Sequence, residues 1–102
     1  MQIFGCQFDL PEGKVSHNVF ADWDDKTNLH FVEQIEGEGL KGSEGANGYE
    51  SYLMIHSEDV AKFVLYSLWK GFTFEDRLDI EQLKAMCNEL GISYETQGGL
   101  MH

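Results

Sequence analysis

The sequence is poor in the residues that cross-link small proteins. Its 102 residues include two cysteines, Cys6 and Cys87, and one proline. It has no CxxC pair and no cluster of cysteine and histidine at the spacing of zinc ligands, which excludes the common structural zinc motifs. A lone cysteine pair favours reduced thiols, although the spacing leaves a Cys6–Cys87 bridge open. We therefore expect a core held by packing, with no cofactor and no metal.

Long apolar runs are also missing. The longest uninterrupted run is Phe63-Val-Leu-Tyr66, whereas a membrane span needs roughly 20 apolar residues. The N-terminal stretch MQIFGCQFDL contains neither lysine nor arginine and reaches Asp9 too early for a signal peptide. These features predict a cytoplasmic protein without a membrane partner.

Basic residues are scarce. Seven lysines and arginines stand against eighteen aspartates and glutamates, so the formal net charge is −11. A field of this sign repels phosphate backbones, which argues against direct nucleic-acid binding, and it attracts basic protein surfaces. The alternative interpretation is that the acidity serves solubility alone.

Alternating apolar residues predict the strands. The even positions from 4 to 10 are apolar, and the odd positions from 15 to 23 form a second such set apart from His17. We expect Leu10 to pair with Val15, because a shift by one residue would turn one apolar set outward. Two further strands are expected at 29–35 and 49–56. The glycine-rich acidic segment between them is either a hairpin connection or a mobile arm that orders against a partner.

Two helices are expected to follow. The first begins at Ser57, whose side chain can bond the free N–H groups of the first turn. Apolar residues surround this helix, and we expect the stripe through Val60, Val64 and Leu68 to face the core. Such a helix is predicted to be sandwiched between the sheet and the second helix. The second helix is expected between Asp79 as its N-cap and a glycine, Gly91, that can close it in the left-handed conformation.

These elements predict the α+β class. The expected architecture is a β-meander, an antiparallel sheet of about four strands, with two helices packed on one face in the order ββββαα. Residues 92–95 are the candidate for a short C-terminal strand. Residues 1–95 are expected to form a single domain, and 96–102 a flexible tail.

A calcium loop is the first chemical site to consider. Asp22, Asp24, Asn28 and Glu33 match oxygen-ligand positions of such a loop, but Lys26 occupies a position where another oxygen ligand belongs. An ammonium group would repel the cation. We therefore interpret this segment as an acidic turn.

Catalytic residues are the second possibility. A nucleophile pair of Cys6 and His17 would need positive surroundings that favour the thiolate, and an acidic protein offers the reverse. No Ser–His–Asp arrangement stands out, and carboxylates are too numerous for one pair to be singled out. We predict that the protein is not an enzyme; a deep pocket lined by His17 or His56 would be the sign of one.

Protein binding is the remaining hypothesis. Carboxylates at turns and helix starts can present charge as a phosphate backbone does, and exposed aromatic side chains can anchor a partner. The predicted partner-binding residues are Phe20, Asp22, Asp24, Asp25, Glu36, Glu38, Glu44 and Tyr66. In size, charge and lack of catalytic residues, the chain resembles bacterial toxin-immunity proteins and phage anti-defence inhibitors such as anti-CRISPRs.

That resemblance implies an inhibitor with a basic protein partner. The expected target is a bacterial nuclease or another nucleic-acid-binding enzyme, whose basic nucleic-acid-binding or catalytic surface the inhibitor would cover. The alternative is a homodimeric structural or adaptor module that uses Phe63, Tyr66 and Trp69 as a helix-face interface.

Overall fold

The computed structural model describes residues 1–38, 48–70 and 79–101, and within them one sheet and two helices. The five strands are β1 (Gln2–Leu10), β2 (Gly13–Trp23), β3 (Leu29–Glu36), β4 (Gly48–Ile55) and β5 (Tyr94–Met101). Between β4 and β5 lie α1 (Ser57–Lys70) and α2 (Ile80–Leu90). The sheet is antiparallel throughout with strand order β1-β2-β3-β4-β5. The predicted α+β meander with the order ββββαα is confirmed, with a fifth strand after the helices.

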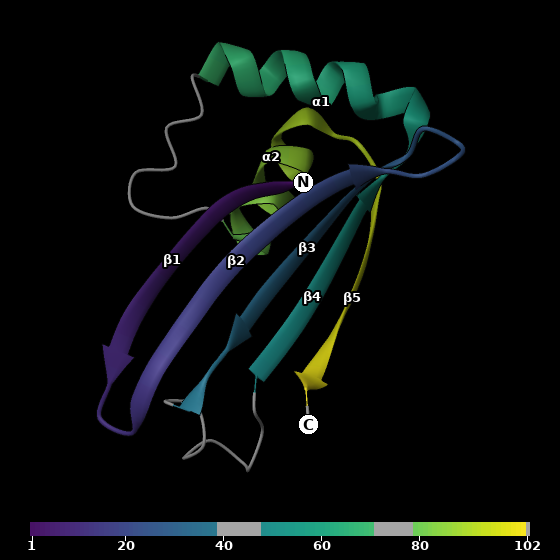
Figure 1. Ribbon diagram of the computed structural model, residues 1–102. Helices are drawn as coiled ribbons and strands as arrows, with labels where there is room; N and C mark the ends of the chain where they lie inside the picture. The colour runs from purple at the N-terminus through teal and green to yellow at the C-terminus, as the bar shows by residue number, and fades with distance from the viewer. Residues whose placement is uncertain (39–47, 71–78, 102) are drawn as a thin grey trace.

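Both helices lie on one face of the sheet and toward one end of its strands (Figure 1). The core forms where they meet it, and Phe31 of β3 packs its ring against Phe63 of α1 with centroids 5.8 Å apart. The strands run on past the helices, so Phe8 and Leu10 at the far end of β1 stay exposed although they belong to the inward set. The core residues are Val19, Ala21, Leu29, Phe31, Leu53, Ile55, Val60, Phe63, Ile80, Leu83, Met86, Cys87 and Ile92.

The C-terminal residues form a full strand, and this corrects the predicted tail. β5 pairs with β4 from Ile55↔Tyr94 to Gly48↔Met101. Residues 96–101 therefore extend the sheet as its edge strand, because β4 offers them an unpaired row of backbone groups. Residues 96–101 are TQGGLM, and this sequence has no alternation of apolar and polar residues from which a strand could be predicted.

The β1–β2 hairpin has a tighter turn than expected. Leu10 pairs with Gly13 and Phe8 pairs with Val15, whereas Leu10 was predicted opposite Val15. The register differs by two residues, which leaves every side chain on its expected face because the strand period is two.

The first helix corrects the prediction made for its faces. Its buried residues are Val60, Phe63 and Ser67, whereas Val64 and Leu68 are exposed. Within the part of the chain that the structure describes, the helix packs on one side and is not sandwiched. Ser67 can take a core position because its hydroxyl donates to the Phe63 carbonyl oxygen at 2.9 Å, which satisfies the buried polar group within the helix.

The second helix confirms its predicted ends. The Asp79 carboxylate accepts a hydrogen bond from the Gln82 N–H at 2.9 Å, as an N-cap should. Gly91 adopts φ +70°, the left-handed conformation that a glycine accepts without strain. Ile92 then folds back and is buried against the core. Among the described residues, no helix is long and apolar enough to cross a membrane.

Candidate partner-binding surface

The β2–β3 turn is organised around the Asp24 carboxylate. It accepts hydrogen bonds from the backbone N–H groups of Lys26 and Asn28, both at 2.9 Å. It also accepts one from Asn28 Nδ2 at 3.0 Å and lies 2.7 Å from His30 Nε2. These contacts, that of His30 first and that of the Asn28 side chain next, hold the pKa of Asp24 well below its usual range. Asp24 therefore fixes the shape of the turn.

This turn is joined to the start of α1. The Asn28 side-chain oxygen accepts a hydrogen bond from the Ser57 N–H at 2.9 Å. The turn that contains Asp25 therefore lies beside the first turn of α1, which contains Glu58 and Asp59. The turn and the helix start lie at the same end of the molecule (Figure 1). The bond satisfies one of the free N–H groups at the helix start. The start of α1 is thus capped by the Asn28 side chain from a distant loop.

The start of β5 brings a further carboxylate to this end. The sheet register places Asp22, His30, Met54 and Glu95 in one row across β2, β3, β4 and β5. Glu95 Oε2 lies 3.4 Å from His56 Nε2, just before α1. We call the six carboxylates gathered here the acidic end: Asp22, Asp24, Asp25, Glu58, Asp59 and Glu95.

Few permanent positive charges compensate the acidic end. The N-terminal ammonium group pairs with Asp22 at 2.8 Å, and Lys26 stands in the turn itself. Among the described residues, Asp25 and Glu58 are exposed and have no ion-pair partner. They are therefore available to a positively charged group from outside the molecule.

The structure divides the predicted partner-binding residues. Asp22, Asp24 and Asp25 come together with carboxylates of α1 and β5. Glu36 lies at the other end of the sheet, where it pairs with Ser16, and Glu38 follows it. Ser16 and Asp22 are six positions apart on β2, which separates the two groups by about 20 Å. Glu44 lies outside the described residues.

The two predicted aromatic anchors occupy different places. Phe20 is half-buried on the open face of the sheet, paired with Val32. Tyr66 lies between the two helices, where its hydroxyl donates to Glu89 of α2 and Lys70 stands over its ring. Tyr66 therefore helps to hold α1 on α2. Of the three residues predicted for a homodimer interface, Phe63 is buried, Tyr66 is half-buried and Trp69 is exposed.

The His17 side chain serves the fold. It is buried, its Nε2 lies 3.1 Å from Glu33 Oε2, and Phe4 packs edge-on against its ring. The same Glu33 oxygen accepts a hydrogen bond from the Ile80 N–H at 3.2 Å. The pair thus ties β2 and β3 to the first turn of α2. Cys6 lies opposite His17 in the register, but among the described residues no hydrogen bond joins its thiol to the imidazole.

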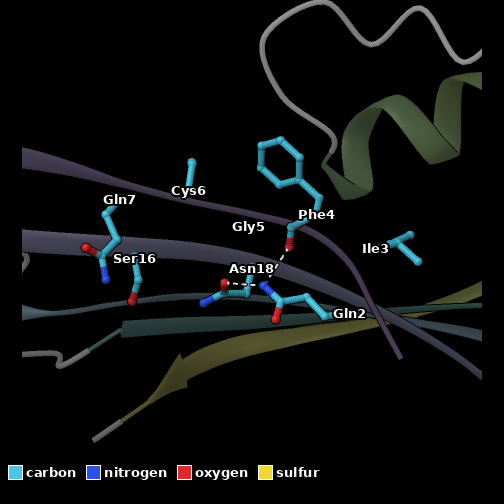
Figure 2. Close-up of a pocket in the computed structure, with 8 residues that line it drawn as sticks. All are labelled: Gln2, Ile3, Phe4, Gly5, Cys6, Gln7, Ser16 and Asn18. Carbon is cyan, nitrogen blue, oxygen red and sulfur yellow. Dashed lines mark hydrogen bonds between the residues drawn. The ribbon is translucent and has the colours of Figure 1, made fainter.

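One hollow lies over the edge of the sheet at β1 and β2 (Figure 2). Its volume is about 740 Å³, and it is shallow and open to solvent. Gln2 Nε2 donates to Asn18 Oδ1 at 2.9 Å and to the Phe4 carbonyl oxygen at 3.2 Å, so the amides in its wall satisfy one another (Figure 2). Its lining holds no carboxylate, histidine or lysine.

The part of the chain that the structure describes contains no group of three or more histidine, cysteine, aspartate or glutamate residues placed to hold a metal ion. In the β2–β3 turn, the Asp24 oxygens are taken up by N–H donors. Comparison with protein-family models, curated proteins and solved structures finds no match to this chain. The function is therefore argued from the surface itself.

Three members of the acidic end are missing from the predicted partner-binding residues. Glu58 and Asp59 were recognisable as the acidic start of a helix, but only the hydrogen bond between Asn28 and Ser57 brings them beside the turn. Glu95 arrives through the β4–β5 pairing, in a strand predicted to stop at that residue. No signal within either segment could have revealed the other.

Proposed function

We propose that this protein is a stoichiometric inhibitor that binds the basic nucleic-acid-binding or catalytic surface of a bacterial enzyme through its acidic end. The observation that supports the proposal is the convergence of six carboxylates from three separate segments at one end of the sheet. Such a concentration of charge attracts lysine and arginine side chains and speeds encounter with them. Its expected place of action is the cytoplasm, where nucleases and other nucleic-acid-binding enzymes work.

The rigidity of the turn favours this role. Asp24 is held by four contacts, so the neighbouring Asp25 is displayed on a backbone that needs little further ordering when a partner binds. A preorganised surface loses less conformational entropy on association than a flexible one. Direct binding of nucleic acid is not proposed, because the phosphate backbone and this surface carry the same sign of charge.

The proposal is tested by neutralising the exposed carboxylates. The variant Asp22→Asn/Asp25→Asn/Glu58→Gln keeps Asp24 and hence the turn. Immobilised wild-type protein is used to isolate basic partners from a bacterial lysate, and the affinity of each purified partner is then measured by calorimetry at rising salt. We expect the triple variant to bind about tenfold more weakly, since exposed ion pairs each contribute roughly 0.2–1 kcal/mol.

The matched control removes the same number of charges elsewhere. This control variant combines Glu36→Gln, Glu38→Gln and Glu81→Gln. Glu36 and Glu38 lie at the opposite end of the sheet, and Glu81 lies on α2. This control should bind like the wild type, and salt should weaken the wild-type complex. Equal loss in the two triple variants, or an affinity that salt does not change, would contradict the proposal.

A further inference from the structure

The outer side of α1 carries a second apolar surface. Leu65, Leu68 and Trp69 are 69%, 62% and 79% exposed, and Val64 and Ala61 lie beside them. The spacing i, i+3, i+4, i+7 and i+8 puts these five residues on one stripe of the helix. Single exposed apolar residues are ordinary on protein surfaces, but a contiguous stripe marks an interaction site. We call it the α1 stripe.

The α1 stripe is not needed to hold the helix in place. Val60, Phe63 and Ser67 on the opposite side are buried in the core. Tyr66 and Lys70 contact Glu89 of α2, which fixes the helix along its flank. The helix therefore already has one buried face, and the α1 stripe remains for another molecule.

The charge around the α1 stripe indicates what that molecule is. Glu58 stands one helical turn before Ala61 on the same side, so the stripe is continuous with the acidic end. Among the described residues, two lysines lie near the stripe: Lys62 on its border and Lys70 beside Trp69, and Lys70 pairs with Glu89 at 3.2 Å. A second copy of the chain would bring another net charge of −11 toward this surface, and the repulsion opposes association. A partner with positive charge beside an apolar surface complements both features.

We infer that the α1 stripe is the apolar half of the partner-binding surface. It docks an amphipathic basic segment of the partner, with apolar side chains over Leu65, Leu68 and Trp69 and with lysine or arginine side chains over the acidic end. Trp69 is the central anchor, since a buried tryptophan contributes far more to binding than an exposed ion pair does. This inference rests on the proposed function and specifies the chemistry of the partner.

Tryptophan fluorescence tests the inference. The chain has two tryptophans, so Trp23→Phe leaves Trp69 as the only reporter. One probe is a synthetic helical peptide of leucine and lysine with one apolar face, and the other is polylysine of equal charge, which has no apolar face. We expect the amphipathic peptide to shift the emission of Trp69 to shorter wavelength and to bind at least about tenfold more tightly than polylysine.

Variants then locate the contact. Leu65→Ser/Leu68→Ser is expected to reduce the affinity for the amphipathic peptide about tenfold and to leave polylysine binding unchanged. The matched control, Ile3→Ser/Tyr52→Ser, replaces two exposed apolar residues of the sheet and should bind both probes like the wild type. Circular dichroism of each variant checks that the fold is kept.

The outcomes separate this inference from the proposed function. If polylysine binds with a salt-sensitive affinity but the amphipathic peptide binds no better and leaves Trp69 unshifted, the inference is overturned and the proposed function stands. If neither probe binds, both are overturned. A shift of Trp69 with protein concentration alone, together with a dimer in sedimentation, would show that a second copy covers the α1 stripe and would also overturn the inference.

Discussion

Two cysteine residues show how position in the fold sets chemistry at the residue scale. Cys87 lies on α2 within the core, and Cys6 lies on the exposed edge strand. Burial, with a smaller contribution from the negative charge of Asp59, raises the pKa of the Cys87 thiol to about 11. Because the thiolate is the reactive form, Cys87 should be inert at neutral pH. Both cysteines are free, so no bridge joins them.

Thiol labelling at pH 8 tests this difference. In the native protein we expect only the Cys6 thiol to react rapidly with a disulfide reagent. After unfolding in urea, we expect both thiols to react. The variant Cys6→Ser should show no rapid reaction in the native state, whereas Cys87→Ser should keep it. Rapid labelling of both thiols without denaturant would contradict the burial of Cys87.

The raised pKa of Cys87 also links stability to pH. The folded protein holds the thiol neutral while the unfolded chain ionises it near 9. The resulting stabilisation is fully present below the unfolded pKa and is lost as the pH rises through the folded pKa of about 11. At neutral pH the thiol is neutral in both states, so stability does not change with pH through this group, and it falls as the pH rises from about 9 to about 11.

At the scale of elements, α1 shows what the sequence predicts and what it leaves open. Its start at Ser57 follows from local residues, but apolar residues surround the helix and two apolar faces compete for the core. By residue type, the stripe of Val60, Val64 and Leu68 is more hydrophobic than the face that carries Phe63 and Ser67. The structure buries Val60 but takes Phe63 and Ser67 into the core in place of Val64 and Leu68. Phe63 packs against Phe31 of the sheet, and the Ser67 hydroxyl donates to the Phe63 carbonyl oxygen. Sequence periodicity cannot foresee either contact.

The second helix was predictable almost in full, and the last strand was not. The ends of α2 depend on Asp79 and Gly91, whose effects are local. β5 depends on its position beside β4, since Gly98 and its neighbours have low strand propensity and gain order only from pairing. The acidic end could not be predicted either, because its carboxylates come together only through the pairing of the strands and the position of α1.

Truncation measures how much β5 contributes. A chain ending at Glu95 loses the pairs that run from Leu53↔Thr96 to Gly48↔Met101. We expect its free energy of unfolding in urea to fall by about 3 kcal/mol or more, because β4 becomes an unprotected edge as the ladder is lost. Removal of His102 alone serves as the control and should change stability by less than about 0.5 kcal/mol. If the chain ending at Glu95 is as stable as this control, the prediction of a flexible tail would be right after all.

At the scale of the whole molecule, charge is distributed unevenly over an elongated body. The principal dimensions are 42 × 27 × 22 Å, and the helices cover one end of the sheet (Figure 1). The acidic end and the α1 stripe lie at that same end, one defined by charge and the other by exposed apolar area. This arrangement sets the orientation in which a basic partner would approach.

A titration with hexalysine, followed through the backbone amide signals of the isotope-labelled protein by NMR, shows whether a cationic ligand binds at the acidic end. If hexalysine binds there, we expect the largest shift changes on residues 22–28, on Glu58 and Asp59 and on Glu95, and we expect them to fade as salt is added. Shift changes spread evenly over the surface, or centred on Glu36 and Glu38 at the opposite end, would contradict this expectation.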